Sequence, residues 1–121
     1  MNMRTALIEA FLAGDSQAAA SFIATDATFN SPVRSYRGVD RIEPLWAAID
    51  GILTDIHLVG VLGGSDETAG FFEGHVGGEP IEGVLRVQGG EDSPVNDVTL
   101  MLRPYGPMKA AIAEMEQRLN S

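Results

Sequence analysis

The sequence contains no cysteine, a single lysine and no long uninterrupted apolar segment. Without cysteine, a disulfide scaffold, a cysteine-ligated zinc site and thiol catalysis are excluded. Lys109 and seven scattered arginines do not form the positive cluster that a nucleic-acid backbone or an anionic membrane attracts, so neither partner is expected. Glu9 and Asp15 interrupt the first apolar stretch. We therefore expect no signal peptide and no membrane span, and a cytoplasmic protein.

Acidic residues dominate what is present. The 121 residues include 17 acids against 8 bases, for a net charge of −9, and this length predicts one domain over residues 1–121. Between residues 66 and 97, Arg86 is the only basic residue among the acids, which flank glycine-rich turns. This pattern is typical of a solvated acidic rim and disfavours polyanionic ligands.

The first half of the chain shows helical spacing of apolar residues and one short strand. We expect a helix over 3–13, a short second helix that reaches Ile23, and a strand over 26–31 that stops at Pro32. Residues 32–38 are expected to form a loop. A third helix follows, with Asp40 and Glu43 spaced as a capping box.

The second half alternates in the manner of strands. Strands are predicted at 55–62, 68–77, 80–88 and 94–103, separated by glycine-containing turns. These connections are too short for parallel crossovers, so this part of the sheet should be antiparallel. Pro107 opens a last helix, whose apolar stripe we interpret as packing.

Two stretches carry a resemblance to a known family. Residues 26–33 (DATFNSPV) with 36–38 (YRG), and residues 96–104 (NDVTLMLRP), are similar to the nuclear transport factor 2-like superfamily, in its SnoaL-like, polyketide-cyclase and ketosteroid-isomerase-like branch. The resemblance implies an α+β fold in which a cone-shaped, mixed, mainly antiparallel sheet wraps around the third helix. It also implies an apolar small-molecule pocket and a homodimer that forms through the outer face of the sheet.

The catalytic residues of two family branches are incomplete in this chain. By the resemblance, the isomerase base would fall on Ser31 and its tyrosine on Leu7, and neither side chain can do that chemistry. Asn30 and Arg103 are similar to residues of the hydrolase branch, but Pro104 stands where a second carboxylate is needed. Steroid isomerisation and epoxide hydrolysis are therefore not expected.

Asp97 is the best catalytic candidate, because it lies in the stretch most similar to the acid/base position of polyketide cyclases. Alternation places Asp97 and Arg103 on one face of their strand, and Val98, Leu100 and Leu102 on the other. Either face could line the pocket, and the second is the more apolar. If the first face is solvated, Asp97 is an ordinary surface carboxylate.

His57 and His75 are the only histidines, and their spacing does not match a metal site. His75 shares a strand face with Glu73, so the two could form an acid/base pair inside the cone. The opposite orientation would put His75 on the dimer side. No metal is expected.

Aromatic residues complete the candidate pocket. Tyr36 lies in the loop at the expected pocket mouth, and Trp46 lies on the stripe of the third helix, where a core position is the plainer interpretation.

Two functions remain open. One is an enzyme acting on a small carbonyl or polyketide-like compound, with Asp97 and His75 as acid/base groups in a pocket lined by Asn30, Tyr36, Trp46, His57 and Arg103. The other is a non-catalytic ligand-binding or dimerisation module. No dinucleotide or phosphate loop is present, so no cofactor is expected.

Overall fold

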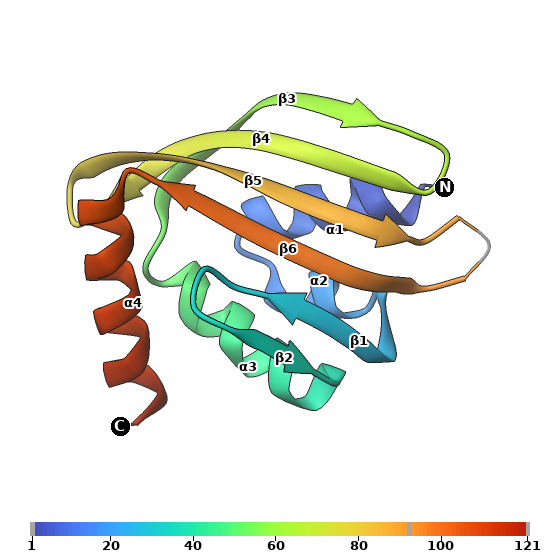
Figure 1. Ribbon diagram of the computed structural model, residues 1–121, viewed down its shortest axis with the longest axis horizontal. Coiled ribbons are helices and arrows are strands. Elements are labelled where there is room, and N and C mark those ends of the chain that lie inside the picture. The colour runs from blue at the N-terminus through green and yellow to red at the C-terminus, as the bar shows by residue number, and fades with distance from the viewer. Residues whose placement is uncertain (1, 92, 121) are drawn as a thin grey trace.

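The computed structural model describes residues 2–91 and 93–120, which form four helices and six strands. In chain order the elements are α1 (Met3–Leu12), α2 (Ser16–Ala20), β1 (Ile23–Asn30), β2 (Ser35–Arg37), α3 (Val39–Asp50), β3 (Thr54–Gly63), β4 (Glu67–Val76), β5 (Glu79–Gly89), β6 (Val95–Arg103) and α4 (Tyr105–Leu119). The strands form one sheet in the order β2-β1-β6-β5-β4-β3. Figure 1 shows this sheet curving over α1, α2 and α3, with α4 at one end.

Strand pairing confirms the predicted mixed, mainly antiparallel sheet. Strands β3 to β6 form an antiparallel meander, β1 pairs with β2 in the same manner, and β1 pairs with β6 in parallel. The four strands predicted in the second half are present to within two residues. The turn between β4 and β5 places Gly77 and Gly78 at positive φ, a conformation that glycine adopts without steric cost.

Local predictions in the first half needed correction. Ile23, assigned to the second helix, begins β1, because the buried side chain pairs with Val95 of β6. The predicted loop contains β2, which is only three residues long and too short to show alternation. The capping box at Asp40 is wrong: α3 begins at Val39, and its N-cap is Gly38 with φ of 100° and no side-chain cap. Asp92, one of the acids expected on the solvated rim, lies outside the described residues.

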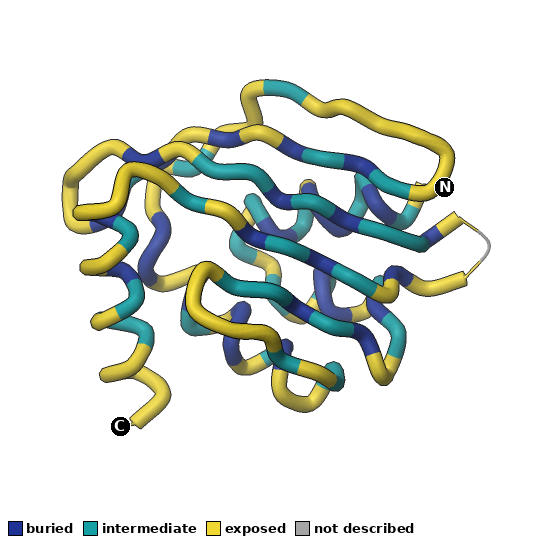
Figure 2. The backbone as a smooth tube through the Cα atoms, viewed as in Figure 1, coloured by how far each residue is buried: buried dark blue, intermediate teal, exposed yellow. Residues whose placement is uncertain are grey.

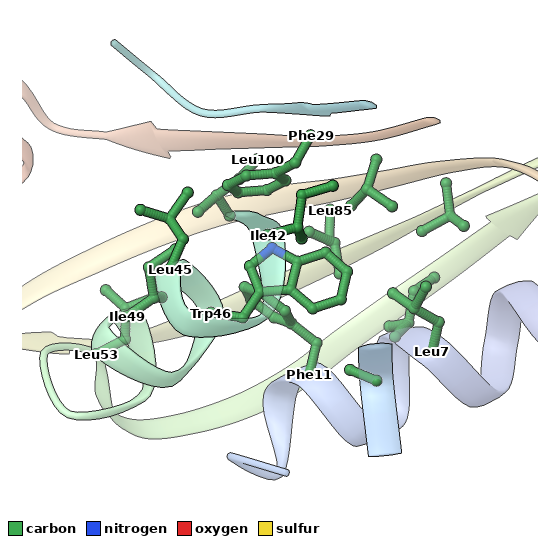
Figure 3. Packing of buried hydrophobic residues seen from close by; sticks show 14 of the residues in the cluster. Leu7, Phe11, Phe29, Ile42, Leu45, Trp46, Ile49, Leu53, Leu85 and Leu100 are labelled. Atoms are coloured by element: carbon green, nitrogen blue, oxygen red, sulfur yellow. The ribbon is translucent and has the colours of Figure 1, made fainter. Parts of the chain in front are cut away.

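Trp46 is at the centre of the hydrophobic core (Figure 3). It projects from α3 and is 1% exposed. Its ring makes edge contacts with Phe11 of α1 and Phe29 of β1, at centroid separations of 5.5 and 5.6 Å. The indole N–H has no hydrogen-bond partner among the described residues, and Figure 3 shows the nitrogen on the edge turned toward Phe29. The core therefore joins α1, α3 and the concave face of the sheet.

Glycines on the concave face let the neighbouring layers approach closely. A Cβ atom at Gly83 would lie 2.5 Å from Cζ of Phe72 and 2.6 Å from the backbone oxygen of Met101. At Gly70, a Cβ would lie 2.7 Å from Cγ2 of Ile8 in α1. Real Cβ atoms do not tolerate such separations, so these positions require glycine for close packing.

Arg4 connects the start of α1 to the end of β5 and to the turn between β3 and β4. Its guanidinium is buried, and its Nε donates to Thr68 Oγ1 at 2.9 Å. The Nη1 and Nη2 atoms donate to the carbonyl oxygens of Gly89 at 2.8 Å and Gly64 at 3.2 Å. Figure 1 shows the start of α1 close to the turn between β3 and β4. This buried cation is thus compensated by hydrogen bonds to neutral oxygens.

None of the helices in the described part of the chain combines the length and the apolar character that crossing a membrane requires.

Candidate functional site

An apolar cavity of about 70 Å³ lies where α4 meets α3 and the end of β6. Most of its wall consists of aliphatic side chains, and the polar residues come from the segment after β1 and from α4. The lining residues are Ser31, Pro32, Val33, Arg34, Tyr36, Leu45, Ile49, Ile52, Leu53, Leu100, Leu102, Ala111, Ile112, Met115, Glu116 and Leu119.

Two helices supply the facing walls. Leu45 and Ile49 are buried on the inner stripe of α3, where a spacing of four residues places them on one face. Ile112 and Met115 face them from α4, on the apolar stripe whose spacing predicted packing alone. Near the end of α4, Arg118 donates to the Gly51 carbonyl at 3.3 Å, which links this helix to the end of α3.

A fixed turn forms the border of the cavity. The Ser31 amide donates to the Arg34 carbonyl at 2.9 Å, and the Ser31 hydroxyl accepts from the amides of Val33 and Arg34 at 3.2 Å. These bonds hold the segment between β1 and β2 in one conformation. The side chain of Tyr36 follows on β2, half-buried against the core.

Asp97 lies on the outer face of the sheet, away from the cavity. The buried Val98 and Leu100 occupy the concave side of β6, which decides between the two orientations that alternation allowed. Asn30 donates from Nδ2 to Asp97 Oδ1 at 3.1 Å and to Thr99 Oγ1 at 3.0 Å. Asn30 and Asp97 are therefore brought together, as part of a polar cluster on the surface opposite the cavity.

Arg86 extends this polar cluster across the outer face. Its Nε donates to Glu67 Oε1 at 2.6 Å. This hydrogen bond and the negative charge of Glu67 raise the pKa of Arg86 above its usual value, with a smaller contribution from Asp97. The guanidinium therefore stays charged and neutralises part of the acidic outer face.

The two histidines also lie on the outer side, and neither forms the predicted pair. Glu73 lies 3.4 Å from His57 (Oε1 to Nε2), across the β3–β4 pairing, and not beside His75. His75 instead has its Nδ1 3.8 Å from Oδ2 of Asp55. The pattern of β4 puts Phe72 and Val76 inside, so a His75–Glu73 acid/base pair within the cone is not formed.

Of the seven predicted site residues, Tyr36 alone lines the cavity. Trp46 is buried in the core, and Arg103 forms an ion pair with Glu82 on the outer face. Sequence reasoning missed the wall formed by α4, although the apolar stripe of that helix was visible. In the part of the chain that the structure describes, no group of three or more metal-ligating side chains comes together.

The outer face carries a separate apolar groove, formed across β3, β4, β5 and β6. Leu62, Phe71 and Met101 are 68%, 37% and 49% exposed there, and Val84 lies between them. Figure 2 shows that β3 is exposed along most of its length. Exposed apolar side chains gathered on one face are typical of an interaction surface.

Comparison with known proteins identifies the fold. No protein-family profile matches the sequence, and no curated protein matches it significantly. An uncharacterised protein with a cystatin-like fold from Silicibacter pomeroyi is 20% identical, with a TM-score of 0.91 over 98% of this chain and 86% of that chain. A steroid delta-isomerase from Pseudomonas aeruginosa is 21% identical, with a TM-score of 0.86 over 98% of this chain and 92% of that chain.

A third structure of this kind contains a small ligand. It is a hypothetical protein with a ketosteroid isomerase-like fold from Catenulispora acidiphila in complex with trimethylamine. It is 15% identical, with a TM-score of 0.64 over 82% of this chain and 83% of that chain. Other similar structures are described as NTF2-like proteins of unknown function. At these identities the likeness defines the fold and leaves the chemistry to the residues of this chain.

Proposed function

We propose that this chain, which has the nuclear transport factor 2-like fold, binds a small, mainly apolar molecule between α3 and α4 without catalysing its conversion. The observation that carries the proposal is the composition of the cavity wall, which is aliphatic apart from four residues at its border. Apolar concave sites with a few polar groups are the usual form of small-molecule sites. The ligand bound by the Catenulispora acidiphila protein shows that a structure of this fold can hold a small molecule.

The positions of Asp97 and His75 support the non-catalytic alternative over the enzymatic one. A general acid or base must come within hydrogen-bond reach of the reacting group, directly or through one water. The sheet separates both side chains from the cavity, and Asp97 already accepts a hydrogen bond from Asn30. We therefore propose structural roles for Asp97 and His75.

The size of the cavity limits the ligand. A volume of about 70 Å³ admits a short alkyl chain. A larger molecule would require α4 to move away from α3, at the cost of the packing between Met115 and the core. Short-chain compounds are therefore the appropriate first probes.

Filling the cavity should abolish binding of such a probe. We expect 1-hexanol to bind the native protein, and Met115→Trp to weaken binding by at least about tenfold, because the indole would occupy the same space. The matched control is Ala113→Trp, which places the same ring on the exposed side of α4. Isothermal titration calorimetry measures all three affinities, and thermal melting verifies that each variant folds. Equal affinities in the two variants would place the binding site elsewhere.

We also propose that two copies of the chain associate through the outer groove. Its exposed Phe71 and Met101 provide an apolar centre, and the Arg103–Glu82 ion pair at its border provides both signs of charge for a self-complementary contact.

Replacing Phe71 with arginine should dissociate this dimer, because a charge would be buried without a partner at the centre of the contact. Sedimentation equilibrium at micromolar concentration should report twice 12.9 kDa for the native chain and 12.9 kDa for the variant. Tyr105→Arg, which changes an exposed aromatic residue at the start of α4, should leave the dimer intact. A native protein that sediments as a monomer would contradict the proposal.

A further inference from the structure

We propose that the ligand of the α3–α4 cavity is a short-chain monocarboxylate, whose alkyl chain enters the cavity and whose carboxylate binds Arg34. This inference rests on the proposed function and adds the charge and the orientation of the ligand. Two observations carry it: the distribution of charge around the cavity, and the state of the Arg34 guanidinium.

Charge is confined to the exposed border of the cavity. The lining contains two ionisable side chains besides Tyr36, namely Arg34 and Glu116, and both residues are exposed. The deeper wall is formed by buried residues such as Leu45, Ile49 and Leu100. An amphipathic ligand with one apolar end and one charged end matches this arrangement, because each end meets its own kind of surface.

Arg34 is available to receive an anion. Among the described residues, its guanidinium has neither an ion pair nor a hydrogen bond, whereas Arg37, Arg86 and Arg103 are each paired with a carboxylate. The other basic side chains without a partner in this part of the chain, Arg41 and Lys109, do not line the cavity. Arg34 therefore provides a positive charge without an ion-pair partner at this border, where Glu116 provides the negative one.

The geometry of the turn suits a guanidinium–carboxylate contact. The backbone of Arg34 is held by the hydrogen bonds to Ser31, so less main-chain freedom is lost when a ligand binds. A guanidinium can donate two parallel hydrogen bonds to a carboxylate. The hydroxyl of Tyr36, which has no hydrogen-bond partner among the described residues, is a further donor at the same border.

Glu116 carries the opposite charge to Arg34 at the border of the same cavity. As the single carboxylate on the lining, it repels an anionic ligand and attracts a cationic one. The two border residues therefore have opposite effects on a charged ligand and little effect on a neutral one. This difference separates recognition of charge from a general effect on the shape of the cavity.

The test compares hexanoate, 1-hexanol and hexylamine, which share one alkyl chain and differ in charge, by calorimetric titration at neutral pH and low ionic strength. Hexanoate should bind about two- to fivefold more tightly than 1-hexanol, the range of an exposed ion pair, and hexylamine should bind most weakly. Arg34→Gln should remove the preference for hexanoate without changing the affinity for 1-hexanol. Glu116→Gln should increase the affinity for hexanoate.

Each outcome has a separate meaning. Equal affinities for the three compounds, or a preference for hexylamine, would overturn the carboxylate proposal and leave a neutral or cationic ligand in the cavity. A loss of 1-hexanol binding in Arg34→Gln would show that Arg34 acts through the shape of the border, which also overturns the proposal. Failure of all three compounds to bind the native protein would reject the proposed function itself.

Discussion

Replacing Trp46 with alanine is expected to lower the free energy of unfolding by about 4 kcal/mol. The side chain is 1% exposed and contacts the rings of Phe11 and Phe29, so its removal leaves a large void between α1, α3 and β1. The surrounding helices and sheet can close such a void only in part. Urea denaturation measures this loss. Circular dichroism is the appropriate signal, because Trp46 is the only tryptophan of the chain and its removal leaves no tryptophan fluorescence to follow.

Two control variants define the expected result. Trp46→Phe keeps an aromatic ring and should cost less than half as much as the alanine change. Tyr105→Ala removes an aromatic side chain that is 69% exposed, and should change the stability by no more than about 0.5 kcal/mol. A loss below about 1 kcal/mol for Trp46→Ala would show that Trp46 is not at the centre of the core.

Replacing Arg4 with methionine is expected to cost about 3 kcal/mol. Methionine keeps much of the apolar stem, but it leaves the oxygens of Thr68, Gly89 and Gly64 without the donors that Arg4 supplies. The cost is largest at the Thr68 hydroxyl, because Thr68 is 2% exposed and water does not reach it to replace the missing donor. The same denaturation experiment measures the change.

Arg41→Met serves as the matched control for Arg4, since Arg41 is exposed on α3 and has no ion pair or hydrogen bond among the described residues. It should leave the stability within about 0.5 kcal/mol of the native value. Thr68→Val should cost about 1 kcal/mol, because it removes one of the oxygens bound by the guanidinium. Equal effects of Arg4→Met and Arg41→Met would contradict the structural role of Arg4.

The sheet was the most predictable part of the fold. Alternation and glycine-rich turns located β3 to β6 to within two residues, because these signals are local and recur along the chain. The start of β1 at Ile23 was not predictable in this way, since it depends on pairing with Val95, more than seventy residues later in the sequence. β2 pairs with β1 over only three residues, too few for a periodic pattern.

The site was less predictable, because alternation identifies the two faces of a strand without indicating which one faces the core. Asp97 and Val98 are adjacent in sequence, and only the packing of Val98 against the core places Asp97 outside. The role of α4 was also not predictable from its pattern. Its stripe containing Ile112 and Met115 has the pattern of ordinary packing, and it lines a cavity because the facing surface of α3 does not fill the intervening space.

Intermolecular nuclear Overhauser effects between 1-hexanol and the native protein test the location of ligand binding most directly. Contacts are expected from the alkyl chain to the methyl groups of Ile49, Leu102 and Met115, which line the cavity. No contacts are expected to Phe71 or Met101, which line the outer groove. Contacts confined to the outer groove would contradict a ligand site between α3 and α4.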